Sequence, residues 1–433
     1  MLETVINALK VKDIRRKVYM MLLLLLIFRI GCFIPVPGLV RSEFSEVIGG
    51  NDFLTLMSSI TGGALSQGTL FALGIGPYIN ASIIMQLLSV GIPALERLSK
   101  QGEEGRKKIA QYTRYVTILL ALVQSIAIVV SFGNSAIQTE LFFGSEFVAG
   151  AFMAIVYTAG AFIVMWLGER ITDYGVGNGQ SMIIFVGILA TAGSLILGKF
   201  EVLFAGDTGA IWEILAFVLV SALIFFAIIY VDLSERKVPV QYAKQIKGRK
   251  MYGGQSSAIP IRISGGGVMP LIFSFSILSF PQMIASMIAP EGSFTIWWTN
   301  WMSASAEGWG AVVYTLVLCV LIFAFSFFYA QMQFNPEDVS KNIQQNGGFI
   351  QGIRPGKATE AYLKKISNRI TLFGAIYLSL VAFIPSIAFA WASLDLVNVI
   401  STTGILIVVS VAMEFEKQLQ AQLMMKNYKG FLK

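Results

Sequence analysis

The hydrophobic positions of this chain are gathered into ten long runs, which polar and charged segments separate. A helix needs about 20 mostly apolar residues to cross the roughly 30 Å hydrocarbon core of a bilayer. Runs of this length predict an all-α, polytopic membrane protein with ten transmembrane helices. The predicted spans lie near residues 18–36, 75–94, 114–133, 149–168, 181–198, 211–231, 267–289, 310–331, 370–390 and 396–414.

The basic residues are concentrated in alternate connecting segments. If ten spans cross the bilayer, the segments on the side of the N-terminus hold 29 of the 32 Lys and Arg residues. Only Arg41 and Lys199 lie in loops on the other side, and Arg29 lies within the first span. Because basic residues are retained on the cytoplasmic side, both termini are predicted to be cytoplasmic. One helix more or fewer would scatter the charges, so their pattern also supports the count of ten.

Composition agrees with this fold class and narrows the chemistry. Hydrophobic residues make up 55% of the chain, charged residues 13%, and the mean hydropathy is +0.71. A soluble domain carries about 25% charged residues. The two cysteines lie in apolar spans and histidine is absent, which excludes His bases and disfavours disulfides and metal sites. We therefore expect no cofactor, no metal and no enzymatic activity. No small-residue cleavage site follows the first apolar run, so we interpret it as a span rather than a signal peptide.

Five spans precede residue 205 and five follow it, which suggests two halves, residues 1–205 and 206–433. No internal repeat is evident, so the pseudo-symmetry of the halves is a hypothesis. The second half contains two long basic segments, residues 232–263 and 332–369, both predicted to be cytoplasmic. Connections of this length usually carry function.

The spans lack the charges that ion-coupled transporters place at mid-membrane. Arg29 is the one charge well inside a span, and we expect its side chain to reach the interface or a neighbouring carbonyl group. Polar residues in the spans are amides and hydroxyls, and two interpretations stay open for them: hydrogen bonds between helices, or a face that lines an aqueous path. The residues concerned are Asn80, Ser82, Gln86, Gln124, Ser125 and Gln282.

Residues 57–70 are too polar and too short to cross the bilayer. At about 1.5 Å per residue they would make a helix of about 21 Å. A Gly-rich segment can enter the membrane and turn back only where protein or a water-filled cavity satisfies its amides. We therefore predict a re-entrant segment entered from the external side. Directly after it, Ile75 and Ile79 share one helix face and are either ordinary core residues or part of an apolar constriction.

The motifs of this region resemble a known family. ALGIGPYINASIIMQLL (residues 72–88) and WLGERITDYGVGNGQSMIIF (residues 166–185) are similar to two signatures of the SecY family, the channel subunits of the general protein translocase. GIRPG (residues 352–356) and the segment before it resemble the last large cytoplasmic loop of that family. The resemblance covers essentially the whole chain and is closest to the bacterial branch.

The resemblance implies two five-helix halves around a central hourglass pore, closed from outside by a re-entrant plug near residues 56–70. It implies three sets of site residues. The pore ring comprises Ile75, Ile79, Ile184, Ile272 and Ile407. The plug includes Ser59, Ile60, Thr61, Gly62, Gly63, Ala64, Leu65 and Ser66. A lateral gate between the second, third, seventh and eighth spans includes Asn80, Gln86, Gln124 and Phe280.

The resemblance also implies partners and a location. The basic loops would dock the ribosome and the SecA ATPase, with Arg249, Lys250, Arg354, Pro355 and Gly356 as contact candidates. SecE and SecG would be companion subunits, signal sequences and unfolded polypeptides the substrates, and the bacterial plasma membrane the location; no DNA is expected. The implied function is a protein-conducting channel that also releases membrane spans sideways into lipid. A secondary transporter for small solutes is the alternative, disfavoured by the shortage of charges in the spans.

The turn GVGNG at residues 175–179 is a weak match to a nucleotide-binding fingerprint. The third Gly, a preceding strand and a later acidic residue are missing from the pattern. The resemblance to the SecY family implies instead a tight cytoplasmic turn that enters the fifth span.

Overall fold

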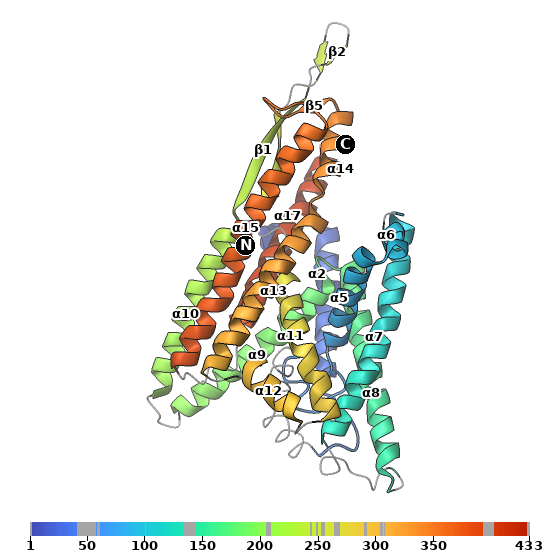
Figure 1. The fold of residues 1–433 in the computed structure, drawn as a ribbon, viewed down its shortest axis with the longest axis vertical. Helices are drawn as coiled ribbons and strands as arrows, with labels where there is room; N and C mark the ends of the chain where they lie inside the picture. The colour runs from blue at the N-terminus through green and yellow to red at the C-terminus, as the bar shows by residue number, and fades with distance from the viewer. Residues whose placement is uncertain are drawn as a thin grey trace.

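The structure is a computed structural model in which long helices run side by side along the longest axis of the molecule (Figure 1). It describes residues 2–40, 58, 61–99, 101–132, 142, 144–204, 209–242, 245–247, 250–252, 256–263, 269–289, 292–303, 306, 308–392 and 402–430. A helix lies over each of the ten hydrophobic runs. In chain order these helices are α2 (Lys12–Gly31), α5 (Gly76–Gly91), α7 (Glu103–Phe132), α8 (Glu146–Tyr174), α9 (Gly179–Phe204), α10 (Gly209–Asp232), α11 (Met269–Ile288), α13 (Trp309–Gln333), α15 (Lys357–Ala392) and α17 (Thr402–Gly430).

Length and composition identify membrane-crossing candidates among these helices. Within the described residues, 5 helices are long and apolar enough to cross a bilayer, and up to 6 if the pair α5 and α6 (Pro93–Ser99), which is bent by 104°, counts as one span. The mostly helical membrane fold is therefore confirmed. That all ten helices cross stays a prediction.

Several helices begin or end at other residues than the hydrophobic runs that predicted them. α7 begins at Glu103, α15 begins at Lys357 and α17 continues to Gly430, so each extends well beyond its apolar run. The hydropathy pattern marks only the part of a helix that faces lipid or core. α2 ends at Gly31, before the predicted end at residue 36, because the chain turns extended there and Pro35 forms a β-bridge with Thr69.

One buried apolar cluster joins the two parts of the chain. It takes residues from α2, α5, α8 and α9 and also from α10, α11, α13, α15 and α17. Around this core α7 packs on α5 and α8, whereas α13 packs on α11 and α15. Two short helices complete the bundle. α1 (Leu2–Lys10) packs against α17, where the Thr4 hydroxyl donates to a Glu416 carboxylate oxygen at 3.4 Å, and α12 (Ser293–Met302) joins α11 to α13.

The prediction that the protein is all-α was wrong for the two long basic segments. The segment after α10 forms β1 (Glu235–Tyr242), β2 (Gln245–Lys247), β3 (Lys250–Tyr252) and β4 (Ser256–Arg262), and the later segment adds α14 (Pro336–Gln345) and β5 (Gly348–Phe349). β1 pairs antiparallel with β4, from Glu235 opposite Arg262 to Gln241 opposite Ser256. β5 pairs with the other edge of β1, so the sheet order is β4-β1-β5.

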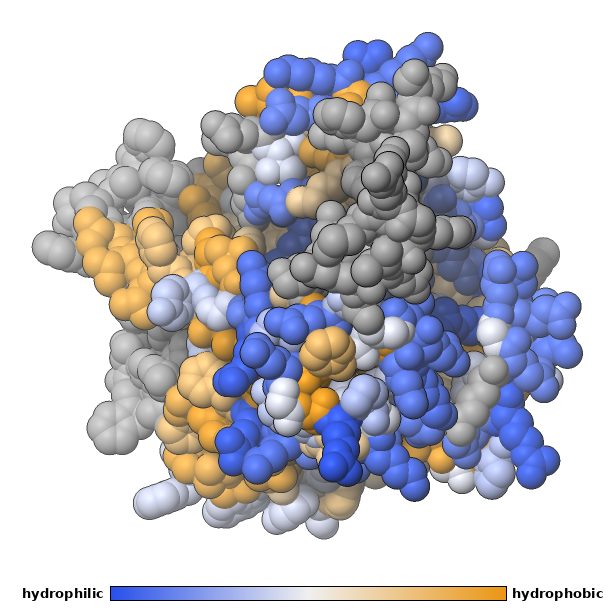
Figure 2. Space-filling view, turned by 90° about the horizontal axis from the view of Figure 1, so that it is seen from above, coloured by the Kyte–Doolittle hydropathy of each residue, from blue (hydrophilic) through white to orange (hydrophobic). Residues whose placement is uncertain are grey.

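This sheet ties the two basic segments into one unit, which we call the cytoplasmic body after the side of the membrane predicted for these segments. Val238 and Val240 alternate along β1 with exposed residues and pack on Ile343, Ile350 and Leu363 from the later segment. Alternation of this kind is the usual pattern of a half-buried strand. Figure 2, seen from this end of the molecule, shows mostly hydrophilic residues over the end face and hydrophobic residues along one flank.

Candidate functional site

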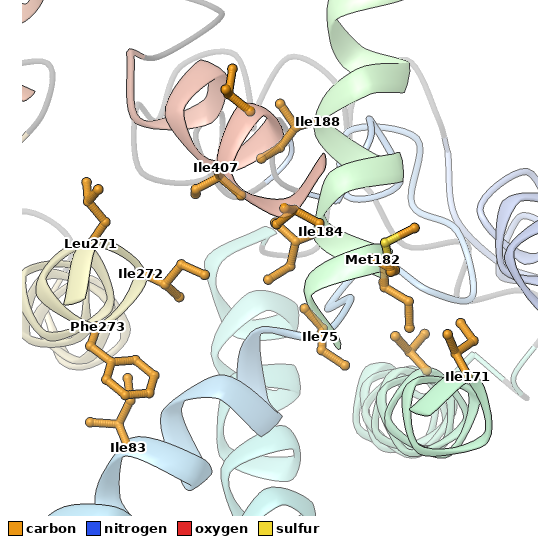
Figure 3. Close-up of a cluster of buried hydrophobic side chains, with 14 of the residues drawn as sticks. Ile75, Ile83, Ile171, Met182, Ile184, Ile188, Leu271, Ile272, Phe273 and Ile407 are labelled. Carbon is orange, nitrogen blue, oxygen red and sulfur yellow. The ribbon is translucent and has the colours of Figure 1, made fainter. Parts of the chain in front are cut away.

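Five isoleucines from four distant parts of the chain meet at the centre of the helix bundle. Ile75 is the N-cap residue of α5, Ile184 lies on α9, Ile272 on α11 and Ile407 on α17, and all four are buried in the large central cluster. Ile79, one turn along α5, is partly buried and packs against the same cluster. Figure 3 shows Ile75, Ile184, Ile272 and Ile407 arranged around one centre. The structure thus brings together all the residues predicted for the ring.

Local sequence explains how two of these residues are placed. Gly74 has φ +53°, a conformation that glycine adopts without strain, and it turns the chain into α5. Pro77 in the first turn suits a helix start because its missing N–H would have had no partner there.

Ile188, one turn beyond Ile184 on α9, also lies in the cluster. Sequence reasoning missed Ile188, although its spacing of four from Ile184 could have indicated it.

The described part of the predicted plug comprises Ser58 and residues 61–70, and residues 61–70 form a succession of turns rather than a helix. Gly62, Gly63 and Gly68 have φ values of +73°, +83° and +58°. Hydroxyl groups replace the missing helical bonds: Thr61 Oγ1 donates to Ser58 O at 3.0 Å, and Thr69 Oγ1 donates to Ala64 O at 3.0 Å. The prediction of an irregular, glycine-bearing segment is confirmed for residues 61–70. Two of the predicted plug residues, Ser59 and Ile60, lie outside the described residues.

Several contacts hold this segment inside the bundle. The chain after α2 pairs with it through Val36 N to Gly68 O at 3.1 Å and Leu70 N to Ile34 O at 2.9 Å. Ala64 is buried in the same central cluster as the isoleucines of the ring. A Cβ atom on Gly160 of α8 would lie 1.9 Å from the Leu70 carbonyl oxygen, so α8 approaches the segment closely only because it has glycine there.

Arg29 provides a further contact with the plug segment. Its Nη1 atom donates to the Gly62 carbonyl oxygen at 3.5 Å, a long hydrogen bond, and its guanidinium lies 5.3 Å from the Phe33 ring centre. A Cβ atom on Gly62 would lie 2.5 Å from that Nη1 and 3.1 Å from the carbonyl oxygen of Gly187. The expectation that Arg29 reaches a neighbouring carbonyl group is confirmed, and the carbonyl belongs to the plug segment.

The polar residues predicted for the gate lie where α5 and α7 face α11 and α13. Tyr329 of α13 donates its hydroxyl to Gln86 Oε1 of α5 at 2.5 Å, and Gln86 Nε2 donates to Ser82 Oγ at 3.1 Å. Gln86 therefore makes an interhelical hydrogen bond, one of the two interpretations that the sequence left open. Tyr329 itself was not predicted, because a tyrosine in an apolar run gives no distinguishing signal.

The other gate candidates lie on the same helices. Gln124 is buried on α7, and Asn80 is half-buried on α5. Phe280 of α11 packs on a second apolar cluster that contains Leu65 of the plug segment and Ala121 of α7. α11 contacts both α5 and α7, and Tyr329 joins α13 to α5. We call this contact of α5 and α7 with α11 and α13 the gate seam, after the lateral gate that the sequence predicted there.

The cytoplasmic body contains an exposed turn at residues 354–356. Arg354 and Pro355 are exposed, and Gly356 has φ +97°. The turn is fixed because Thr359 Oγ1 donates to Arg354 O at 2.9 Å and Ser340 Oγ donates to Gly356 O at 2.8 Å. A cavity of about 580 Å³ opens beside this turn, lined by residues that include Arg354, Pro355 and Phe349. Of the candidates in the first basic segment, Lys250 lies in β3 and Arg249 lies outside the described residues.

The GVGNG segment forms a tight turn, as the family resemblance implied. Gly179 N donates to Thr172 Oγ1 at 2.9 Å, and Gln180 N donates to Asn178 Oδ1 at 3.1 Å at the start of α9. A Cβ atom on Gly179 would lie 2.0 Å from the Gly168 carbonyl oxygen. Glycine is therefore required for close packing of α9 on α8.

Comparison with known proteins shows full-length similarity to one family. A family model described as SecY matches residues 69–416. The chain is 38% identical over 444 residues to the protein translocase subunit SecY of Streptomyces galbus and 40% identical over 438 residues to that of Halalkalibacterium halodurans, with 100% of this chain and of each relative covered.

Solved structures have the same fold. A structure described as a protein-conducting channel superposes with a TM-score of 0.68 at 20% identity and covers 94% of this chain and 92% of its own. Sec61 in the canine ribosome-channel complex from the endoplasmic reticulum superposes with a TM-score of 0.64 at 19% identity, again over 94% of this chain and 92% of that chain.

Proposed function

The chain belongs to the SecY family, and from this premise we propose that it forms a passive protein-conducting channel whose five central isoleucines seal the pore around a moving polypeptide. The observation that carries the proposal is the meeting of Ile75, Ile184, Ile272 and Ile407 in one buried apolar cluster. Branched apolar side chains accommodate any passing polypeptide and resist a continuous column of water, as hydrophobic constrictions do. The channel has no energy source of its own, so partners supply it.

Residues near 56–70 act as the plug at rest. The plug segment is packed against the ring cluster through Ala64 and bound to α2 through Arg29, which supports a closed resting arrangement. Its turns are held by single hydrogen bonds, each with a net worth of about 0.5–1.5 kcal/mol. A segment built in this way can leave without unfolding a helix.

The gate seam releases apolar segments into lipid. It combines the interhelical hydrogen bond between Gln86 and Tyr329 with polar residues such as Asn80 and Gln124, and with Phe280. A seam that is only partly apolar is weakly held. A signal sequence competes for it because each Leu or Ile at mid-membrane gains about 0.3 to 0.6 kcal/mol on the insertion scale.

The cytoplasmic body is the docking surface for partners. A solved relative is a Sec61 channel in complex with a ribosome. In this chain the exposed Arg354 on its fixed turn suits an acidic protein surface or RNA phosphates. We assign the same role to Arg249 and Lys250. The SecA ATPase is the second partner of this surface, and SecE and SecG are companion subunits.

The two halves, residues 1–205 and 206–433, separate at the gate seam when the channel opens. Both termini face the cytoplasm, and the membrane is the bacterial plasma membrane. The concentration of 29 of the 32 basic residues in the segments on one side supports this orientation.

Transport by purified protein tests the proposal. Vesicles that contain this chain with SecE and SecG should import a secretory precursor only when SecA and ATP are present. Uptake of small solutes along an ion gradient, with no movement of the precursor, would instead identify a secondary transporter.

A further inference from the structure

The short helix α12 is not explained by the channel function. It joins α11 and α13, two helices of the gate seam, at the end of the molecule opposite the cytoplasmic body (Figure 1). Four of the seven Trp residues of the chain lie within residues 297–309, and no charged residue lies between Glu291 and Glu307. Tryptophan is enriched at the level of the headgroups on both sides of a bilayer.

The aromatic side chains of α12 are largely directed outward. Phe294, Trp297 and Trp301 are exposed, and Trp309 at the start of α13 is 79% exposed. The Phe294 ring lies 5.6 Å from the ring of Trp298, so the aromatics form a contiguous group. Tryptophan has an apolar body and a polar N–H group, which suits the boundary between acyl chains and headgroups. In water, this group of rings would be an exposed apolar patch.

α12 is rigidly attached to both of its neighbours. Thr295 is buried and donates its hydroxyl to the carbonyl oxygen of Ala289, just beyond α11, at 2.7 Å. A Cβ atom on Gly310 of α13 would lie 2.0 Å from the Asn300 carbonyl oxygen. The aromatic group therefore has a defined position relative to both helices.

An apolar pocket of about 400 Å³ lies between α11 and α12. Its lining residues are Phe280, Pro281, Ile284, Ala285, Ala289, Gly292, Phe294 and Thr295. Pro281 interrupts the hydrogen bonding of α11, because it lacks an N–H group to donate to the carbonyl of Ile277. The pocket thus lies against the one point along α11 where the described helix is most easily bent.

The size and chemistry of the pocket decide between occupants. Two turns of an α-helix of about 10 Å diameter displace roughly 850 Å³. The space not occupied by atoms in the pocket is about 740 Å³, its open side included, so a signal helix does not fit. The lining is almost entirely apolar, so a water molecule in the pocket would find few hydrogen-bond partners. A phospholipid acyl chain is narrow, flexible and present at high concentration at the aromatic group. It would restore contacts that an empty cavity lacks.

We propose that α12 lies in the external headgroup layer and that the pocket between α11 and α12 binds one acyl chain of an outer-leaflet phospholipid. The leaflet assignment rests on the orientation given under the proposed function. Since the chain lies against Pro281, bending of α11 at the gate seam changes the shape of the site. Gate opening is therefore coupled to the lipid that occupies it.

Photolabelling tests the pocket. The complete complex is reconstituted with a phospholipid that carries a diazirine on one acyl chain, and the labelled peptides are mapped. We expect labelling of residues 280–295 above the level at the exposed Leu219 and Leu223 of α10. Ala285→Leu, which fills the pocket, should abolish the excess. Ala151→Leu, the same change at an exposed position of α8, should leave it unchanged. Equal labelling of α10 and residues 280–295 would overturn the acyl-chain site.

Fluorescence tests the position of α12 without a change in the pocket. In a variant that keeps Trp297 alone, with the other six tryptophans replaced by Phe, lipids brominated near the headgroup should quench more strongly than lipids brominated deep in the chain. Strong quenching by soluble acrylamide, with none by brominated lipid, would overturn the anchor. Precursor import is measured in the same vesicles: import without labelling rejects only the lipid site, whereas loss of both rejects the channel as well.

Discussion

At the scale of single residues, this protein has inert side chains where we propose that a substrate passes and glycines where elements approach closely. In the proposed ring, the isoleucines would offer no hydrogen bond and no charge to a passing polypeptide, so they would hold no particular sequence. Gly160 and Gly179, by contrast, admit backbone carbonyl oxygens at distances that no side chain would allow. Each kind of residue makes a separate prediction.

Removal of ring side chains should open a leak. Replacement of Ile75, Ile184 and Ile407 by Gly should raise the ion conductance of the resting channel several-fold, because the constriction becomes wider and wets. Planar-bilayer recordings measure this. Ile171→Gly is the control, since Ile171 is buried in the same cluster but lies on α8, outside the ring. Unchanged conductance in the ring variant would reject the seal.

Gly62 and Gly63 form a matched pair in the plug. Both have positive φ, so alanine costs each of them about 1–3 kcal/mol of backbone strain. Only at position 62 would the new Cβ atom crowd Arg29 and Gly187, whereas at position 63 the nearest such atom is 3.9 Å away. Gly62→Ala should therefore increase the open fraction of the resting channel more than Gly63→Ala does. Equal effects in single-channel recordings would show that the Arg29 contact does not hold the plug.

At the scale of elements, the gate seam depends on few directional contacts between α5 and α13. Tyr329→Phe removes a hydrogen bond with a net worth of about 0.5–1.5 kcal/mol, which shifts the gate equilibrium by about 2- to 12-fold towards opening. Export of precursors with weakly hydrophobic signal sequences should rise accordingly. Tyr377→Phe on α15 is the control, because the hydroxyl of Tyr377 is buried without a partner among the described residues. A double-mutant cycle with Gln86→Leu should show a coupling energy of that size, and additive effects would exclude a direct bond.

The seam can also be locked. Figure 3 shows Ile83 of α5 beside Phe273 of α11, and both belong to the central cluster. In a chain with Cys32 and Cys319 replaced by Ser, Ile83→Cys with Phe273→Cys should crosslink and stop the release of signal sequences into lipid. Reduction of the crosslink should restore release. Unimpaired release from the crosslinked channel would move the gate elsewhere.

The sequence predicted the long helices of this protein more accurately than the strands and turns that connect them. Runs of apolar residues mark spans because the bilayer imposes a length, and the spacing of Ile75 and Ile79 marks one face of one helix. The β-sheet was missed because the long basic segments were judged by charge, although Val238 and Val240 alternate within β1. The hydrogen bond between Gln86 and Tyr329 joins residues 243 positions apart, and no local pattern encodes such a pair.

At the scale of the whole molecule, the two long basic segments form one packed unit, which we propose as the docking surface. Arg354→Glu should weaken SecA-driven import strongly, because a partner loses a cation that the Thr359 and Ser340 hydrogen bonds hold in place. Lys341→Glu makes the same change of net charge at an exposed position of α14 and should have a smaller effect. Import and membrane insertion of the chain are measured in parallel. Equal losses of both would indicate that Arg354 serves orientation in the membrane alone.

The three-stranded sheet has a mechanical consequence. β1 continues from α10, β4 leads towards α11, and β5 lies between α14 and α15, so four helices share one small sheet at the hydrophilic end of the molecule. The 27 residues of α15 from Lys357 to Phe383 precede Pro385 and form a helix about 40 Å long, with its outer end at this sheet. A force applied to this sheet is therefore transmitted to all four helices together. We expect a partner that presses on the cytoplasmic body to rotate these helices as a group, instead of deforming one loop.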